Sequence, residues 1–254
     1  MSLLILVLPG GAARAESRTP NQPLSALHSR VVFAAGRSTD STPGRSLSFL
    51  VNTTSDGHDA NPGNGTCADS AGKCTLRAAI EEANALPAGT KVAVTVRDGT
   101  YKLKLGTLAV TRNNIAITGA GPTATVFKGN GKSAVVRVAG KARASLIKLK
   151  LTNGGIARND GGGLYNSGAT NLANVEVTAN TASSGGGIYN TSGATLDLTS
   201  STVSANSAMS GADSQDGGLG GGIYNAGSLT LWGSTVTGNS SGNGGFDLND
   251  TGGS

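Results

Sequence analysis

The sequence predicts an all-β fold, a parallel β-helix with coils of about 24 residues and a short helix in front of them. Three observations predict it. The chain of 254 residues contains 40 Gly and only 4% aromatic residues, which suits many turns and small side chains. Its apolar residues come in short alternating runs, and a Gly-rich motif returns at nearly regular intervals. Charged residues are only 14%, and the glycines have no three-residue period, so a coiled coil and collagen are excluded.

The first 46 residues are expected to precede the folded part. Residues 3–8 read LLILVL and are followed by Ala13-Arg14-Ala15, which is typical of a secretory signal over residues 1–15. No positive residue precedes the apolar run. Either the true start therefore lies upstream, or the segment is not a signal. Residues 16–46 are polar and rich in Pro and Gly, which indicates a flexible lead.

Two cysteines, Cys67 and Cys74, lie close together in a stretch that contains Gly and Asp. In an exported protein we expect them to form a disulfide that closes a small loop. Two unpaired thiols are the alternative. A metal site is disfavoured, because His28 and His58 lack ligand spacing to the cysteines.

A single strong helix signal follows these cysteines, over residues 76–85. Leu76, Ala79, Ile80 and Ala83 fall on one face at helical spacing. Thr75 is a suitable N-cap, and Pro87-Ala88-Gly89 ends the helix. A strand is expected ahead of this helix, over residues 47–51.

Residues 91–254 carry the internal repeat that predicts the coils. The hexapeptide GGGLYN returns as GGGIYN twice and then in the degraded form GGFDLN. The apolar position after the glycines is Leu164, Ile188, Ile223 and Phe246, so the middle interval is longer than the other two. The long middle repeat holds eleven extra residues, two near Thr191 and nine within residues 207–219. The repeats are residues 161–184, 185–219 and 220–243, with a partial copy at 244–254.

Within the repeats, Asn and Tyr recur at fixed places. Stacked Asn side chains can form a hydrogen-bonded ladder, and stacked Tyr rings an aromatic column. Because their chemistry repeats from coil to coil, we interpret these residues as structural rather than catalytic. They are Tyr165, Tyr189 and Tyr224, then Asn166, Asn190 and Asn225, and then Asn180, Asn206 and Asn239.

Residues 74–85, CTLRAAIEEANA, resemble the bacterial CSLREA domain, whose signature is close to C-[ST]-L-R-E-A-I-x-x-A-N-A. The departure is Ala78, where that family has Glu. The GGGIYN repeats are similar to those of pectin-lyase-like right-handed β-helix proteins, including polymorphic outer membrane protein repeats. The resemblance covers residues 47–254. It implies a right-handed coil, an N-terminal cap over residues 47–90 that contains the helix, and a secreted or surface-attached protein without an assigned reaction.

Catalytic groups are sparse in the sequence. A hydrolase needs a carboxylate pair, and a lyase needs a base beside a group or Ca²⁺ that neutralises the uronate. Arg97-Asp98, Asp160, and Asp213 with Asp216 are the nearest candidates, and we interpret each as a solvated charge in a turn or loop. We therefore expect no catalytic residue, no metal and no cofactor. Calcium would be needed only by a lyase.

The charge is unevenly distributed. Residues 77–150 contain 13 Lys and Arg against 3 Asp and Glu, whereas residues 151–254 contain 1 against 7. Lys102, Lys104, Lys148 and Lys150 alternate with apolar residues, so we expect them to face outward. If their strands stack, they form a basic patch that could hold an anionic polymer, such as an acidic polysaccharide or a teichoic-type chain. The alternative is a solubilising face that protects sheet edges. Nucleic acid is disfavoured, because Tyr101 is the one stacking residue nearby.

Together these features predict a non-catalytic, secreted or cell-surface scaffold that serves adhesion or surface structure. Its expected partner is an extracellular polysaccharide or a host or cell-surface component, and the chain is expected to be a monomer without a transmembrane helix. The alternatives are a polysaccharide lyase or hydrolase and an acidic-polysaccharide-binding module. Because residue 254 falls within the fourth repeat, we expect the natural protein to continue.

Overall fold

The computed structural model describes residues 46–155, 160–209 and 218–242. The chain divides into two compact units, residues 1–41 and 42–254, of which the first lies wholly outside the described residues. The expected signal over residues 1–15, the lead except Ser46, and the partial repeat over 244–254 also lie outside them. The described elements therefore all belong to the second unit.

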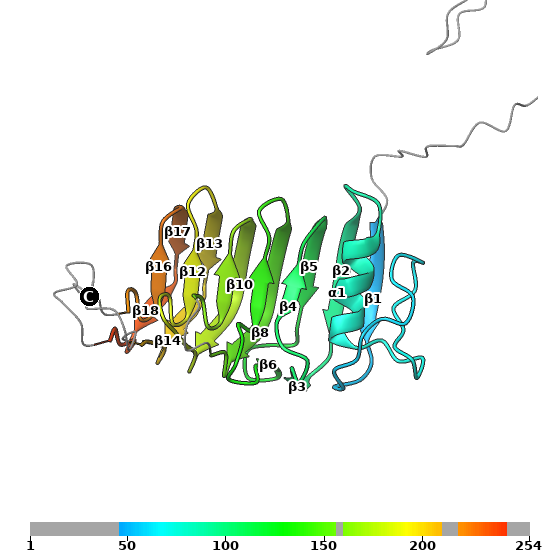
Figure 1. Ribbon diagram of the computed structural model, residues 1–254, viewed down its shortest axis with the longest axis horizontal. Helices are drawn as coiled ribbons and strands as arrows, with labels where there is room; N and C mark the ends of the chain where they lie inside the picture. The colour runs from blue at the N-terminus through cyan, green and yellow to red at the C-terminus, as the bar shows by residue number, and fades with distance from the viewer. Residues whose placement is uncertain (1–45, 156–159, 210–217, 243–254) are drawn as a thin grey trace, which may run out of the picture. The chain divides into compact units, whose positions relative to one another are not determined.

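The second unit is a parallel β-helix, as the sequence predicts. Every strand pair of the described coils is parallel, and strands from successive coils stack in register (Figure 1). The longest path runs through β1 (Ser46–Val51), β2 (Lys91–Val96), β5 (Asn114–Thr118), β8 (Arg143–Thr152), β10 (Ala169–Thr178), β13 (Thr195–Thr199) and β17 (Ser228–Trp232).

Shorter strands complete the other faces of each coil. The second halves of β8 and β10 lie between β3 (Gly99–Lys102) and β6 (Thr125–Lys128) on one side and β14 (Thr202–Ser204) and β18 (Thr235–Thr237) on the other. A separate sheet contains β4 (Leu108–Val110), β7 (Val136–Val138), β9 (Leu164–Asn166), β12 (Ile188–Asn190) and β16 (Ile223–Asn225). The two-residue strands β11 (Thr181–Ala182) and β15 (Ser207–Ala208) form a small third sheet.

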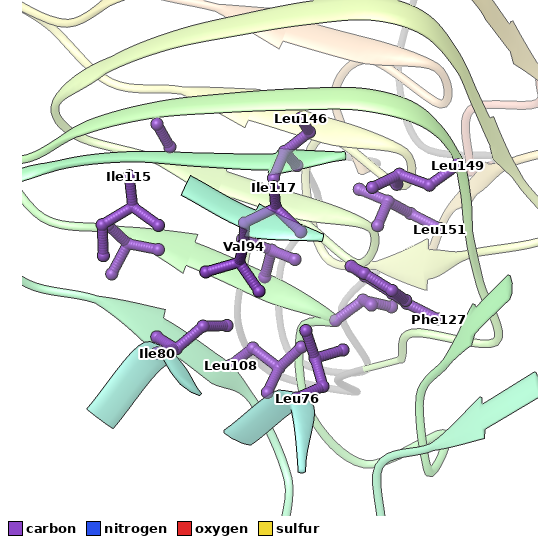
Figure 2. Packing of buried hydrophobic residues seen from close by; sticks show 14 of the residues in the cluster. Leu76, Ile80, Val94, Leu108, Ile115, Ile117, Phe127, Leu146, Leu149 and Leu151 are labelled. Carbon is purple, nitrogen blue, oxygen red and sulfur yellow. The ribbon is translucent and has the colours of Figure 1, made fainter. Parts of the chain in front are cut away.

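Alternation of apolar and polar residues places one face of each strand in the core. In β2, Val92, Val94 and Val96 are buried and the residues between them are exposed. Leu, Ile and Val from successive coils form continuous columns, with the buried Phe127 among them (Figure 2). Burial of these columns is the main source of stability in a solenoid.

Left-handed residues form the corners of the coils. Successive coils place Lys148, Asn174 and Ser200 at one corner, with φ of 55°, 53° and 50°. The chain turns within β8 at Lys148, so Leu146 and Leu149 are both buried while Ile147 is half-buried. The expectation of strict alternation through residues 147–151 is therefore wrong at this corner.

Coil length varies around the predicted value. The stacked pair Leu164 and Ile188 keeps the predicted spacing, whereas the stacked pair Ile117 and Leu146 of β5 and β8 is separated by a longer stretch of chain. The two extra residues near Thr191 lie in a turn that Ala194 N–H closes on the Thr191 carbonyl at 3.1 Å. Most of the nine-residue insertion lies outside the described residues.

The helix α1 (Leu76–Ala85) connects β1 to β2 and packs against β1, β2 and β4 at the N-terminal end of the stack (Figure 1). Its N-cap is Thr75, whose Oγ1 accepts from Ala78 N–H at 3.0 Å. Leu76, Ala79, Ile80 and Ala83 are buried, as their spacing predicts. The helix thus closes the hydrophobic core at this end.

Candidate functional site

Two side chains of α1 bind the free edge of β4. Asn84 Nδ2 donates to the Ala109 carbonyl at 2.8 Å, and its Oδ1 accepts from Thr111 N–H at 2.9 Å. Arg77 donates to the carbonyls of Gly106 and Thr107 at 2.7 and 3.0 Å. Because β4 is the end strand of its sheet, these bonds satisfy backbone groups that would otherwise form an open edge.

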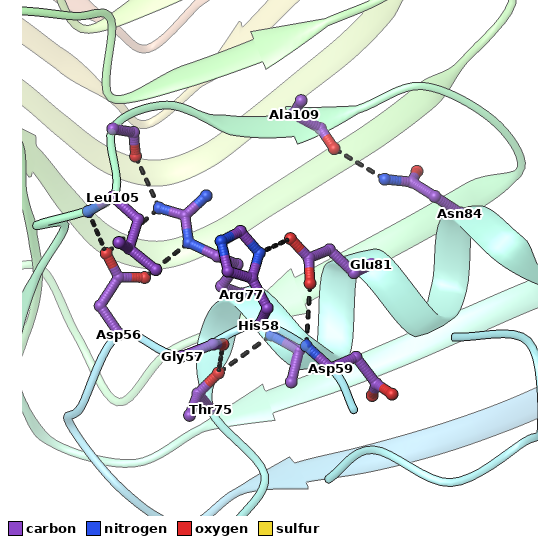
Figure 3. Close-up of polar contacts among 12 residues, drawn as sticks. Asp56, Gly57, His58, Asp59, Thr75, Arg77, Glu81, Asn84, Leu105 and Ala109 are labelled. Atoms are coloured by element: carbon purple, nitrogen blue, oxygen red, sulfur yellow. Dashed lines mark hydrogen bonds and ion pairs between the residues drawn. The ribbon is translucent and has the colours of Figure 1, made fainter. Parts of the chain in front are cut away.

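The loop before the helix is anchored by carboxylates (Figure 3). Asp56 forms an ion pair with Arg77, Oδ1 to Nε at 2.7 Å, and the Arg77 and Asp56 side chains are 7% and 3% exposed. Glu81 accepts from Asp59 N–H at 2.9 Å and lies 2.7 Å from Nδ1 of the exposed His58. These carboxylates therefore tie the loop to the helix.

The same loop contains the disulfide, and Cys67 and Cys74 are joined with a Cα–Cα distance of 5.0 Å. Sequence reasoning found this pair and the apolar face of the helix. It missed Arg77, Glu81, Glu82 and Asp56 as anchors, although charged residues between apolar positions of a capping helix were a usable signal.

The repeated asparagines form two ladders. In the first, Asn166 Nδ2 donates to Asn190 Oδ1 at 2.8 Å, and Asn190 donates likewise to Asn225 at 2.7 Å. The second ladder links Asn180, Asn206 and Asn239 in the same way, at 3.0 and 2.9 Å. Each donating amide also binds a backbone group of a neighbouring coil.

The repeated tyrosines form one stack. The ring centroids of Tyr165 and Tyr189 are 5.5 Å apart, and those of Tyr189 and Tyr224 4.6 Å. The Arg137 guanidinium covers the outer face of Tyr165 at 4.4 Å. Since the ring faces of Tyr165 and Tyr189 are covered, those two rings have none left to stack on a sugar.

The four predicted lysines lie on or just after β3 and on β8. Lys102 pairs in register with Lys128, which the sequence analysis did not single out, and Lys104 follows the end of β3. Lys148 occupies a corner, and Lys150 forms an ion pair with Glu176 at 2.8 Å. That pair neutralises one of the predicted cations.

Of the acidic candidates, the structure describes Asp98 and Asp160. Arg97 and Asp98 are exposed, and Asp213 and Asp216 lie outside the described residues. Burial raises the pKa of Asp160 above its ordinary value, although hydrogen bonds from Ser184 oppose the shift. Among the described residues, no three His, Cys, Asp or Glu side chains come together as a metal site would require.

A basic pocket lies where three turns stack. Its volume is about 460 Å³, and it is lined by residues 88–89, by residues 111–114, and by Lys141 and Arg143. These turns precede β2, β5 and β8, which are neighbours in the main sheet. Arg112, Lys141 and Arg143 bring three cationic side chains to the pocket, and the lining contains no carboxylate.

Sequence reasoning did not identify this pocket. A usable signal was present in the sequence. A basic residue lies at the start of β2, just before β5 and at the start of β8: Lys91, Arg112 and Arg143. The alternation of lysine with leucine instead predicted a basic patch at Lys102, Lys104, Lys148 and Lys150.

The part of the chain that the structure describes contains no helix long and apolar enough to cross a membrane. In comparisons with protein-family models, with curated proteins and with solved structures, no match to this chain was found.

Proposed function

We propose that the chain is an extracellular, non-catalytic β-helix scaffold that serves adhesion or surface structure. The observation that carries this proposal is the repeated use of the same side chains from coil to coil. The Asn amides and Tyr rings that a catalytic site could recruit are bound to their equivalents in the next coil. Such a surface is suited to presenting one rigid face.

The extracellular part of the proposal is supported by the cap. A disulfide between Cys67 and Cys74 is typical of proteins that fold in an oxidising compartment. The apolar run at residues 3–8 and the resemblance of residues 74–85 to the CSLREA domain point the same way. The resemblance to pectin-lyase-like proteins supplies the alternative, a polysaccharide lyase or hydrolase.

Fractionation of the producing cells tests this proposal. We expect the chain in the medium or at the surface, where added protease removes it from intact cells. We also expect Cys67 and Cys74 to resist alkylation until a reductant is added. A chain found only inside the cell with two free thiols would contradict the proposal.

A further inference from the structure

We propose that the basic pocket formed by Arg112, Lys141 and Arg143 binds a linear acidic polysaccharide through its carboxylate or sulfate groups. The pocket is distinct from the lysines that the sequence singled out. It lies on the turn side of β2, β5 and β8, whereas Lys102 and Lys150 belong to the face that contains β3 and β6.

The pocket carries unbalanced positive charge. Among the described residues, Arg112, Lys141 and Arg143 take part in none of the ion pairs. The acidic residues nearest in sequence are engaged or placed elsewhere. Glu81 and Glu82 bind the loop over residues 58–65, and Asp98 follows the opposite end of β2. These three cations repel one another, and a bound anionic ligand would offset that repulsion.

The backbone of the pocket is fixed before any ligand binds. Asn113 has a φ of 63°, and its Nδ2 donates to the carbonyls of Ala83 and Leu86 at 2.8 and 3.2 Å. Its Oδ1 accepts from Gly89 N–H at 3.0 Å, and its carbonyl accepts from Arg143 N–H at 3.0 Å. One residue therefore ties together the turns that carry the cations, which lowers the entropy lost on binding.

The same asparagine removes an obstacle to anion binding. The carbonyls at the C-terminal end of α1 carry partial negative charge, which would repel an anion in the adjoining pocket. Because Asn113 Nδ2 donates to two of these carbonyls, that charge is partly neutralised.

The ligand class follows from these groups. Two guanidinium forks and one ammonium suit carboxylate or sulfate oxygens, and Asn114 adds an amide for hydroxyl groups. About 460 Å³ falls in the range of small-ligand pockets. The lining contains no aromatic ring on which a base could stack, which disfavours single-stranded nucleic acid.

The row of outward residues beside the pocket extends the site. Lys91, Asn114 and Arg143 stand in register on β2, β5 and β8. Lys91 and Arg143 are thus two strands apart, roughly 10 Å, so a polymer can place successive charged groups along the row. A repeating anion fits this arrangement better than an isolated small one.

Binding of heparin, polygalacturonate and neutral dextran to the full, disulfide-bonded chain tests the inference. Heparin supplies sulfate and polygalacturonate supplies carboxylate, so the two arms separate the sources of charge. We expect at least one of them to bind in low salt and dextran not to bind. The double variant Arg112→Gln with Arg143→Gln should weaken binding about tenfold or more.

The matched control removes two charges from the other face, Lys102→Gln with Lys104→Gln, and should change affinity less than about twofold. All four side chains are exposed, so both variants should keep the melting temperature of the parent chain. If the pocket variant unfolds, Lys141→Gln with the same polymers replaces it.

Equal losses in the two double variants would show diffuse attraction and overturn the inference, as would failure of both acidic polymers to bind. The pocket and the scaffold proposal fail separately. Cleavage of a bound polymer would end the scaffold proposal and leave the pocket standing, whereas an intact polymer that does not bind would end only the pocket.

Discussion

Single residues hold the coils together by repeating the same contacts. Asn180 donates to Asn206 Oδ1, to the Leu151 carbonyl and to the Thr178 carbonyl, and its own Oδ1 accepts from Gly154 N–H. Among the described residues, every buried polar side-chain atom has a hydrogen-bond partner. Loss of one such amide would leave several buried groups unpaired, at about 1–3 kcal/mol for each.

Asp160 is the described carboxyl group whose environment opposes its charge. Burial raises its pKa, so the folded state holds the proton more tightly than the unfolded state. The protonated group therefore contributes to the stability of the folded state when the pH is below 3.8, the ordinary pKa of the carboxyl group. This contribution is lost as the pH rises through the pKa of the folded state. At neutral pH the charged Asp160 is therefore destabilising.

Asp160→Asn should raise the melting temperature at pH 7 by about 1–2 °C, since the group is partly exposed and solvent screens its charge. At pH 3 the two proteins should melt within about 1 °C of each other. Thermal unfolding followed by circular dichroism at both pH values measures the difference. A gain of equal size at both pH values would show that the carboxylate charge is not its cause.

At the scale of elements, the helix α1 covers β4, the end strand of the five-stranded sheet. The amphipathic spacing of residues 76–85 was enough to predict the helix and its buried face. The bonds of Arg77 and Asn84 to β4 could not be predicted, because their partners lie at Gly106–Thr111. No sequence feature near the helix shows that this distant segment packs against it. The spacing of Arg77 and Asn84, two helical turns apart, places both on one helical face.

Arg77→Met should lower the free energy of unfolding by about 3–5 kcal/mol, because it leaves the buried Asp56 carboxylate without its cation and the β4 edge without two donors. Urea denaturation of the disulfide-bonded chain measures this. His58→Ala, which removes an exposed partner of Glu81, should cost at most about 1 kcal/mol.

Adding Asp56→Asn to Arg77→Met should recover part of the loss, since the unpaired charge is then removed. If Arg77→Met were no more costly than His58→Ala, the helix would not depend on its contact with the edge of β4.

The Asn ladders could be predicted from the sequence, whereas the corners of the coils could not. The Asn ladders lie where their regular spacing placed them, because a period fixes equivalent positions. Lys148 and Ala179 adopt left-handed conformations that their residue types do not favour, at corners where the equivalent residues of other coils are left-handed too. The basic pocket was missed for the same reason, since turns from three coils of unequal length build it.

At the scale of the whole described unit, charge is divided along the stack. Residues 77–150 carry 13 cations against 3 carboxylates, whereas the described residues after 150 carry no cation and three carboxylates, Asp160, Glu176 and Asp197. The ion pair between Lys150 and Glu176 lies where the two parts meet. An acidic polymer is therefore attracted to the coils nearest the cap and repelled by the later ones.

The central claim is that this β-helix is a scaffold that leaves polysaccharides intact. The full chain is incubated with polygalacturonate, alginate and heparin, with and without Ca²⁺, and polymer length is followed by size-exclusion chromatography. Material prepared in parallel from cells that lack the gene provides the blank. We predict that every polymer keeps its original length in both conditions. Shortening of any one of them above the blank would contradict a non-catalytic scaffold.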